Sequence, residues 1–157
     1  MFQHLPPTQH PPQKPTLLWD GQCGFCAYWV KRWQRMGAQD VQFIPYQEGA
    51  AAFPDIDRPH FKAASRLIEP DGRIFSGPAS AYRSLSYGSA WARQLDRWYA
   101  QHKSFSRFSD KLYQWVADHR NGLFRLTKWL WGSDPHEPRP FWAIYLGVLV
   151  YVIYQWA

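Results

Sequence analysis

The chain reads TLLWDGQCGFC from Thr16 to Cys26. The first four letters are an apolar run that ends at Asp20-Gly21, as in a buried strand that enters a turn. Beyond Cys23 the hydrophobic period becomes helical, and one face of the expected helix carries Cys26, Trp29, Val30 and Trp33. This stretch therefore predicts a strand, a tight turn and a helix that begins at two cysteines.

The segments that follow predict an α/β fold. Residues 41–45 form a second strand candidate, and residues 47–62 are irregular. Two short apolar runs flank a hairpin turn at 69–72 (EPDG), and a helical stretch begins at Gly77-Pro78. The order strand, helix, strand, hairpin, helix is the minimal thioredoxin-like layout. A C-x-x-C pair at the start of the first helix is where that layout places a redox centre.

Length and composition fit one globular domain with extensions. The 157 residues are 46% hydrophobic and 19% charged, which excludes wholesale disorder, and the net charge is +6. We expect a disordered Pro-rich tail at 1–15, a thioredoxin-like domain at 16–103, a helical extension of the same domain at 104–132, a linker at 133–140 and a hydrophobic C-terminal helix at 141–157.

The C-terminal segment has the composition of a membrane anchor. It carries no charge and no polar face, and its aromatic residues lie near its ends. Basic residues precede it and none follows, namely Arg120, Arg125, Lys128 and Arg139. By the positive-inside rule we expect a cytoplasmic domain tethered to the membrane by this helix, with a buried helix as the alternative. The start of the chain lacks the pattern of a cleavable signal peptide.

Two cysteines, Cys23 and Cys26, carry the expected chemistry. A pair at this spacing cannot build a secreted-type disulfide framework, but it can close a disulfide across one helical turn. Cys23 would lie nearest the helix N-terminal amides, whose dipole favours a thiolate. Cys26 would face the core, with less exposure and a higher pKa. We therefore assign the attack on a substrate disulfide to Cys23 and the resolving step to Cys26, with no cofactor beyond the pair.

Other uses of the cysteines are weaker on composition. Haem attachment requires histidine after the second cysteine, where this chain has Ala27. A zinc site would need two further ligands from histidines that are not at paired spacing, namely His60, His102, His119 and His136. Metal binding by His4 and His10 of the tail and an unreactive buried cysteine pair are the remaining alternatives.

Asp20 lies three residues before Cys23. A turn or cap role, in which its carboxylate accepts helix N–H groups, competes with a role as a proton acceptor for a cysteine. A carboxylate this close would also raise the pKa of Cys23 and oppose the helix dipole. We favour the structural role and keep Asp20 among the candidate catalytic residues.

The motif Asp20-x-x-Cys23-x-x-Cys26, after an apolar strand and before an aromatic and basic helix, resembles the DCC family of thiol-disulfide oxidoreductases. The similarity continues in the run PDGR at 70–73 and in the run YQWVADHR at 113–120. The resemblance implies a thioredoxin-like fold and a redox role. Around the cysteines, it carries over the aspartate and the two cysteines of the motif.

The resemblance covers about residues 16–132 and includes one departure from the wider thioredoxin-like group. Those proteins usually have a cis-proline just before the third strand, opposite the cysteines. Here Ala63-Ala64 precede Ser65, and Pro59 lies several residues too early. This departure argues against a standard substrate-docking groove.

The sequence favours a membrane-tethered thiol-disulfide oxidoreductase whose partner is a protein or small-molecule disulfide, with electrons from cellular thiols. The alternative is a non-catalytic, membrane-associated binding module whose cysteines are redox-sensing or structural. Nucleic-acid binding is not expected, because the basic residues are spread over helices and do not form a dense run.

Overall fold

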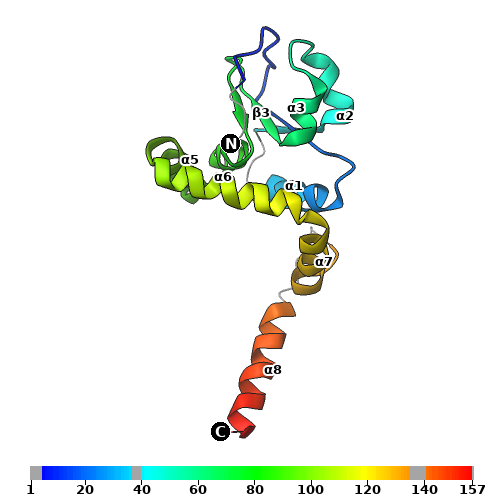
Figure 1. Cartoon of the computed structure of the whole chain (residues 1–157), viewed down its shortest axis with the longest axis vertical. Coiled ribbons are helices and arrows are strands. Elements are labelled where there is room, and N and C mark those ends of the chain that lie inside the picture. Colours follow the sequence, from blue (N-terminus) through cyan, green and yellow to red (C-terminus); the bar gives the residue numbers. More distant parts are fainter. Residues whose placement is uncertain (1–4, 37–39, 135–140, 157) are drawn as a thin grey trace.

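The computed structural model describes residues 5–36, 40–134 and 141–156, and it is an α/β fold built on one small mixed sheet (Figure 1). The strands are β1 (Thr16–Trp19), β2 (Gln42–Pro45), β3 (Arg66–Ile68) and β4 (Ile74–Ser76). Their order in the sheet is β2-β1-β3-β4, in which β1 and β2 are parallel and the other two pairs are antiparallel.

The part of the chain that the structure describes also has eight α-helices and one 3-10 turn. They are α1 (Gly24–Arg35), α2 (Tyr46–Gly49), η1 (Ala50–Ala52), α3 (Arg58–Ala63), α4 (Pro78–Ser86), α5 (Ala90–Gln101), α6 (Lys103–Asp118), α7 (Arg120–Trp131) and α8 (Phe141–Trp156). The predicted strand, helix, strand, hairpin and helix occur in the predicted order, but the segment predicted as irregular, 47–62, contains most of α2, η1 and α3.

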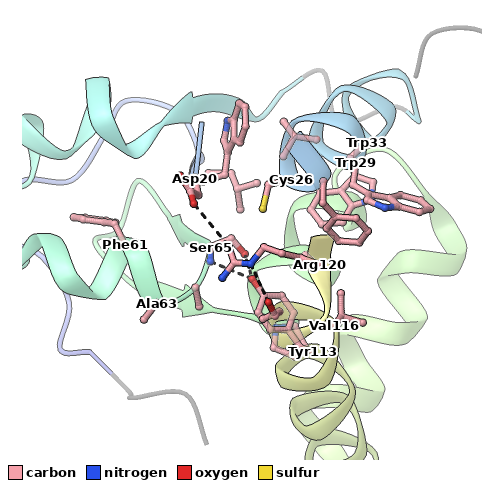
Figure 2. A pocket seen from close by; sticks show the side chains of 18 of the residues that line it. Asp20, Cys26, Trp29, Trp33, Phe61, Ala63, Ser65, Tyr113, Val116 and Arg120 are labelled. Carbon is pink, nitrogen blue, oxygen red and sulfur yellow. Dashed lines mark hydrogen bonds and ion pairs between the residues drawn. The ribbon is translucent and has the colours of Figure 1, made fainter. Parts of the chain in front are cut away.

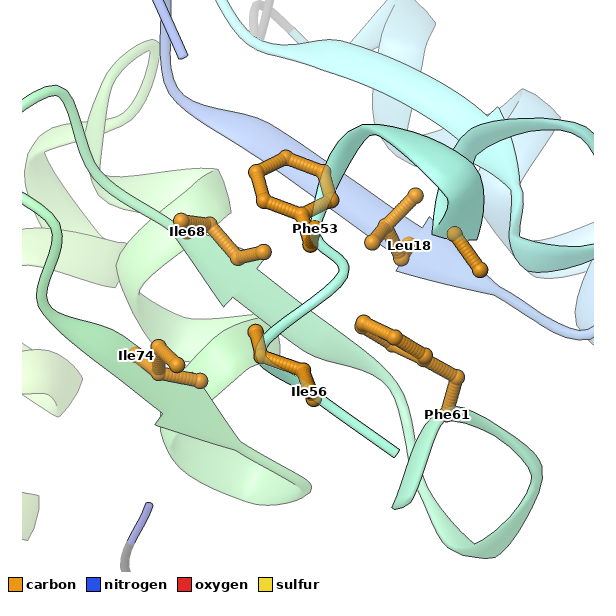
Figure 3. Close-up of a cluster of buried hydrophobic side chains, with 7 residues drawn as sticks. Leu18, Phe53, Ile56, Phe61, Ile68 and Ile74 are labelled. Carbon is orange, nitrogen blue, oxygen red and sulfur yellow. The ribbon is translucent and has the colours of Figure 1, made fainter. Parts of the chain in front are cut away.

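Side chains of β1 alternate between two apolar clusters, because successive strand residues point to opposite faces of a sheet. Leu18 lies on one face, packed among Ala50, Phe53, Ile56, Phe61, Ile68 and Ile74 (Figure 3). Leu17 lies on the other face with Val30, Val41 and Leu67, and the tryptophans Trp19 and Trp33 pack against this second cluster. The second face is the one that α1 covers, so it is the face on which the cysteine helix rests.

The hairpin between β3 and β4 follows the predicted turn chemistry. The N–H of Gly72 donates to the carbonyl of Glu69 at 2.9 Å. Gly72 has a φ of +83°, a backbone conformation that residues other than glycine rarely adopt. The turn lies beside the start of β1, since Thr16 pairs with Ile68. It is therefore at the end of the sheet opposite to the cysteines.

The disordered tail predicted at 1–15 is wrong for its described part, residues 5–15. Thr8 is buried, and its N–H donates to the carbonyl of Gly72 at 2.9 Å. Its hydroxyl and the N–H of Gln9 both donate to the Asp55 carboxylate, at 2.8 and 2.7 Å. Proline sets the extended shape of this segment, but these hydrogen bonds hold it against the fold. Residues 1–4 lie outside the described residues.

The helical extension predicted at 104–132 is two helices that join at His119. The first of them, α6, packs against α4 and α5 through polar contacts: Tyr82 meets Ser109 at 3.2 Å and Tyr99 donates to Asp110 at 2.7 Å. The second, α7, turns away at the junction and packs against α1. The predicted helical extension thus lies against the sheet domain.

The predicted membrane anchor and the tethered cytoplasmic localisation that depends on it are not supported. Among the described residues, no helix is both long enough and apolar enough to cross a membrane. The C-terminal helix α8 has 16 residues, a length of about 24 Å at 1.5 Å per residue, against a hydrocarbon core of about 30 Å. It meets α7 where the ring of Trp129 stacks on that of Tyr145 at 4.5 Å. The predicted linker at 133–140 falls mostly outside the described residues.

The buried core of the sheet generates a prediction about stability. Leu18→Ala removes a side chain with 0% exposure from the cluster of Figure 3, and we expect a loss of about 3 kcal/mol in the free energy of unfolding. Urea denaturation of the reduced protein measures it. Leu126→Ala, at a leucine that is 47% exposed on α7, is the control and should cost less than about 1 kcal/mol. Equal losses for the two variants would contradict the assigned core.

Candidate active site

The two cysteines lie where β1 runs into α1. The N–H of Cys23 donates to the carbonyl of Asp20 at 3.1 Å, which closes the turn after the strand. Cys23 is the N-cap of α1, and its Sγ accepts a hydrogen bond from the N–H of Cys26 at 3.2 Å. An N-cap side chain normally satisfies a backbone donor two or three residues along, and here a sulfur does so. The cap geometry therefore fixes the first cysteine at the positive end of the helix.

The two sulfur atoms are in direct contact. Both cysteines are free, and the Sγ of Cys26 donates to the Sγ of Cys23 at 2.7 Å. This hydrogen bond is the main cause that lowers the pKa of Cys23 to about 6 from an ordinary value of 9.0, against a smaller opposing effect of burial. The same bond, together with burial, raises the pKa of Cys26. At neutral pH the pair holds one negative charge, on Cys23, and one proton, on Cys26.

A cation from a distant part of the chain lies beside this thiolate. Arg120, the first residue of α7, carries a positive charge near the sulfur of Cys23 that further lowers the pKa of this cysteine. One of its nitrogens, Nη1, lies 3.7 Å from Oδ2 of Asp20, and its Nε donates to the carbonyl of Ala117 at 2.9 Å. Arg120 therefore faces two anions, the thiolate and a carboxylate.

Asp20 is held by donors in addition to this arginine. Its Oδ1 accepts the N–H of Gln22 at 3.1 Å and the side-chain amide of Gln47 at 2.9 Å. The amide oxygen of Gln47 in turn accepts the N–H of Gly21 at 3.1 Å. These contacts give Asp20 the turn-forming geometry that the structural interpretation of this residue expects.

The expected order of exposure of the two cysteines is reversed. Cys23 retains 8% of its surface, whereas Cys26 is partly exposed. The reason is α7, which packs against the start of α1: a Cβ placed on Gly24 would come within 2.8 Å of the ring of Phe124. That ring also meets Tyr28 edge-on at 6.4 Å. The helix that brings the arginine to Cys23 therefore also packs beside this cysteine, against Gly24.

Cys26 opens instead into an apolar cavity of about 280 Å³ (Figure 2). The cavity lies between α1, the ends of β1 and β3, α4 and α6. Its apolar walls include Phe25, Trp29, Trp33, Leu112 and Val116, and its charged members are Asp20, Lys62 and Arg120. Cys26 is among the lining residues, and Cys23 is not.

The residues before β3 reach the same site, since Leu18 of β1 pairs with Arg66. Ala63-Ala64 occupy the position expected for a cis-proline, and the N–H of Ser65 donates to the hydroxyl of Tyr113 at 3.2 Å (Figure 2). The Ser65 hydroxyl lies 3.0 Å from the same oxygen and 2.7 Å from that of Ser80. Burial raises the pKa of Tyr113, so its hydroxyl stays protonated. The backbone N–H of Ser65, directly before β3, is therefore already hydrogen-bonded to a side chain of α6.

Comparison with known proteins adds the family. Residues 17–126 match the model of the DCC1-like thiol-disulfide oxidoreductases. The chain belongs to this family. The resemblance found in the sequence is thereby confirmed, and the matched range contains Asp20, both cysteines, Arg120 and Phe124. No curated protein and no solved structure matches the chain.

The structure of this DCC1-like chain brings the three candidate residues Asp20, Cys23 and Cys26 together. Sequence reasoning placed neither Arg120 nor Gln47 in the site with the cysteines. Arg120 had a signal, because it ends the run at 113–120 that carries the family resemblance. Gln47 had none, since it lies in a segment without a regular pattern.

The metal alternatives find no partner set in the described part of the chain. There, no three His, Cys, Asp or Glu residues are grouped as metal ligands would be. His4 and His136 lie outside the described residues. Of the three other histidines named as possible zinc ligands, His60 lies in α3, His102 caps the C-terminal end of α5, and His119 stacks on Trp115 at 4.9 Å.

The cover over Cys23 generates a prediction about access. Phe124→Ala should speed the modification of Cys23 by a bulky aromatic disulfide reagent by at least about threefold, because it opens the N-terminal end of α1. The control is Trp129→Ala, which removes from the same helix an aromatic residue that is 55% exposed. This variant should leave the rate unchanged. Stopped-flow absorbance in a Cys26→Ser background gives the rate of this single thiol. An unchanged rate in Phe124→Ala would show that α7 does not control access.

Proposed function

We propose that this protein catalyses thiol–disulfide exchange through Cys23 and Cys26. The observation that carries the proposal is the direct hydrogen bond from the Cys26 thiol to the Cys23 sulfur at 2.7 Å. The contact keeps one sulfur deprotonated and the other protonated at the same pH. Two sulfurs this close can also form a disulfide with small side-chain movements.

The exchange balances within the pair and its substrate. The reduced protein gives two electrons and two protons in total to a substrate disulfide, which leaves as a dithiol, and a bond forms between the two protein sulfurs. The reverse reaction breaks that bond and oxidises a substrate dithiol. No metal or organic cofactor is needed for either direction, and the substrate is a protein or small-molecule thiol or disulfide.

The arrangement around the pair supports a thioredoxin-like interpretation of the fold, which is part of this proposal. β1 and β2 are parallel and joined through α1, and an antiparallel β3–β4 hairpin follows on the other side of β1. The cysteines begin the helix that follows the first strand. This is the position that a thioredoxin-like layout gives to its redox centre.

In this proposal Arg120 and Asp20 are positioning residues. The Arg120 guanidinium stabilises the Cys23 thiolate, and Asp20 with its ligand Gln47 orients the guanidinium and the turn before the helix. Asp20 has hydrogen-bond donors on both sides, so we give it no proton-transfer role. The charge of the thiolate is then offset by the helix N-terminus and by one arginine.

The pH dependence of alkylation checks these roles. In the reduced protein, the iodoacetamide reaction of Cys23 should rise with pH through a midpoint near 6, because only the thiolate reacts. Cys26→Ala should shift this midpoint upward most, since the Cys26 hydrogen bond is the largest cause of the low pKa. Arg120→Met should shift it upward by less, and Arg125→Met, on the same helix, should not shift it. A midpoint that stays above 8 in the wild-type chain would contradict the assignment.

A redox titration tests the proposed function itself. The protein is equilibrated across dithiothreitol and glutathione ratios, and free thiols are counted by mass after alkylation. We expect a reversible two-electron transition, absent from Cys23→Ser and Cys26→Ser. The low pKa of Cys23 stabilises the reduced form, so the midpoint should lie above that of a reductant such as thioredoxin, at about −270 mV. If no internal disulfide forms at any ratio, the proposed function is wrong.

A non-catalytic binding module is the second candidate. The observation that favours it is a set of large apolar side chains with at least two-fifths of their surface exposed on α5 to α7, namely Trp91, Trp98, Phe108, Leu112, Trp115, Leu126 and Trp129. Such surfaces commonly bind other proteins. This candidate predicts that Cys23→Ser keeps the biological function, whereas thiol–disulfide exchange predicts its loss.

A further inference from the structure

The proposed exchange requires two thiolates in succession, first at Cys23 and then at Cys26. An arginine lies near both sulfurs, Arg120 at the start of α7. We propose that Arg120 acts in both steps: it supports the Cys23 thiolate in the first step and, once Cys23 is joined to the substrate, the Cys26 thiolate that resolves the mixed disulfide. This inference rests on the proposed function and adds a role in the second step to the positioning role given above.

The first argument is the position of the arginine. The two Sγ atoms are 2.7 Å apart, so a cation that is near Cys23 is also near Cys26. Cys26, Asp20 and Arg120 all line the same cavity, and Figure 2 shows their side chains around it. Arg120 therefore does not have to move from one part of the site to another to act on the two sulfurs in turn.

The second argument is that contacts other than the sulfurs hold this side chain. The Nε of Arg120 donates to the carbonyl of Ala117 at 2.9 Å, and Nη1 lies 3.7 Å from Oδ2 of Asp20. Asp20 is itself held by the N–H of Gln22 and by the side-chain amide of Gln47. None of these contacts requires a charge on a cysteine. The guanidinium therefore keeps its place when the first cysteine becomes bonded to a substrate.

The third argument is the change of charge between the two steps. In the reduced pair, the hydrogen bond that Cys26 donates to Cys23 is the first cause that raises the pKa of Cys26, followed by burial and by the negative charge of Cys23. A sulfur in a mixed disulfide carries no charge, so the first and third of these effects are lost after the first step. Burial and Asp20 still oppose a thiolate at Cys26, and Arg120 favours it. The pKa of Cys26 therefore falls when this cysteine has to attack, and Arg120 supplies the positive charge that lowers it.

The other titratable side chains of the cavity wall come from three further helices. They are Lys62 of α3, Tyr82 of α4 and Tyr113 of α6. Burial raises the pKa of Tyr113, so its hydroxyl carries no charge. Lys62 is exposed, and water screens its charge, whereas the side chain of Arg120 keeps only 34% of its surface. Arg120 is therefore the better placed of these two cations to act on the sulfur of Cys26.

The two steps conserve atoms and electrons. The Cys23 thiolate bonds to one sulfur of the substrate disulfide, and the other substrate sulfur leaves as a thiolate that takes up a proton from water. Cys26 then gives its proton to water, and its sulfur attacks Cys23. The bond between the two protein sulfurs forms, the bond from Cys23 to the substrate breaks, and the second substrate sulfur leaves and is protonated. The substrate disulfide is reduced to two thiols, and the protein dithiol is oxidised to a disulfide.

A stopped-flow experiment on the full chain separates the two steps. The reduced protein is mixed with an excess of an uncharged dipyridyl disulfide, whose released thiopyridone absorbs near-ultraviolet light. The first release comes from the attack of Cys23 and becomes faster with more reagent. The second release comes from the attack of Cys26 on the mixed disulfide, so its rate is independent of reagent concentration, and it should be absent from Cys26→Ser. The pH dependence of this second phase gives a midpoint for Cys26 in the mixed disulfide.

Variants of the arginine test its role in the second step. Arg120→Met should raise the midpoint of the second phase by about one pH unit, because a nearby opposite charge lowers a pKa by about that much or more. At neutral pH the second phase should be about threefold slower, since an about tenfold loss of thiolate is partly offset by the greater nucleophilicity of a more basic sulfur. Arg120→Lys keeps the charge, and its midpoint should lie between those of the wild type and Arg120→Met. Arg125→Met, at an exposed arginine of the same helix, should leave the midpoint unchanged.

A variant of the aspartate tests the inference with the opposite sign. Asp20→Asn keeps an oxygen that can accept the N–H of Gln22 but removes the negative charge that opposes a thiolate at Cys26. The midpoint of the second phase should move to lower pH, and below the wild-type midpoint this phase should become faster. A slower second phase there would mean that Asp20 takes the proton of Cys26, and it would overturn the inference.

The outcomes separate the two proposals. If the wild-type chain shows no second release, as expected for Cys26→Ser, no internal disulfide forms, and the proposed function fails together with the inference. If the second release occurs with the same midpoint in Arg120→Met as in the wild type, or if Arg120→Lys behaves like Arg120→Met, the exchange function stands and the role of Arg120 in the second step is wrong.

Discussion

The contact between the Cys26 thiol and the Cys23 sulfur is the interaction on which the site depends. It sets the two sulfurs apart chemically, because one becomes the donor and the other the acceptor. The first turn of α1 supplies this geometry at once, since the N–H of Cys26 points at the same sulfur. A spacing of three residues at a helix start therefore gives the thiolate two donors from a single residue.

The environment of this thiolate couples charge to access. Arg120 is the first residue of α7, so the helix that supplies the cation also lies across the start of α1. Electrostatic support for Cys23 and physical cover of Cys23 cannot be separated in this arrangement. Next to Cys26, by contrast, a cavity lies between the end of β1, the residues before β3, α4 and α6. The two neighbouring sulfurs thus have different surroundings, one beside the arginine and the other in the wall of the cavity.

Local features of this structure could be predicted from the sequence. The strand that ends at Trp19, the turn at Asp20 and the helix from Gly24 are encoded in one short segment, and the hairpin turn is encoded in the residues at 69–72. The contacts of Arg120 and Gln47 with this segment join residues far apart in the chain, which periodicity cannot reveal. The prediction of which cysteine is more exposed was wrong for the same reason, because exposure depends on how distant helices pack around the start of α1. The apolar composition of α8 suggested a membrane span, but the length of the helix does not support one.

The hydrogen bonds that hold the N-terminal segment, residues 5–15, against the fold also affect the order of folding. Thr8 is bonded to Asp55 and to Gly72, which follow it by 47 and 64 residues, so this segment cannot dock until the hairpin has formed. Contacts across so many residues carry a large loop-closure entropy and form late. This segment is synthesised before the residues that hold it, and it is thus among the last to find its place. This segment docks at the hairpin turn. A tag fused before it would therefore lie near the end of the sheet farthest from the cysteines.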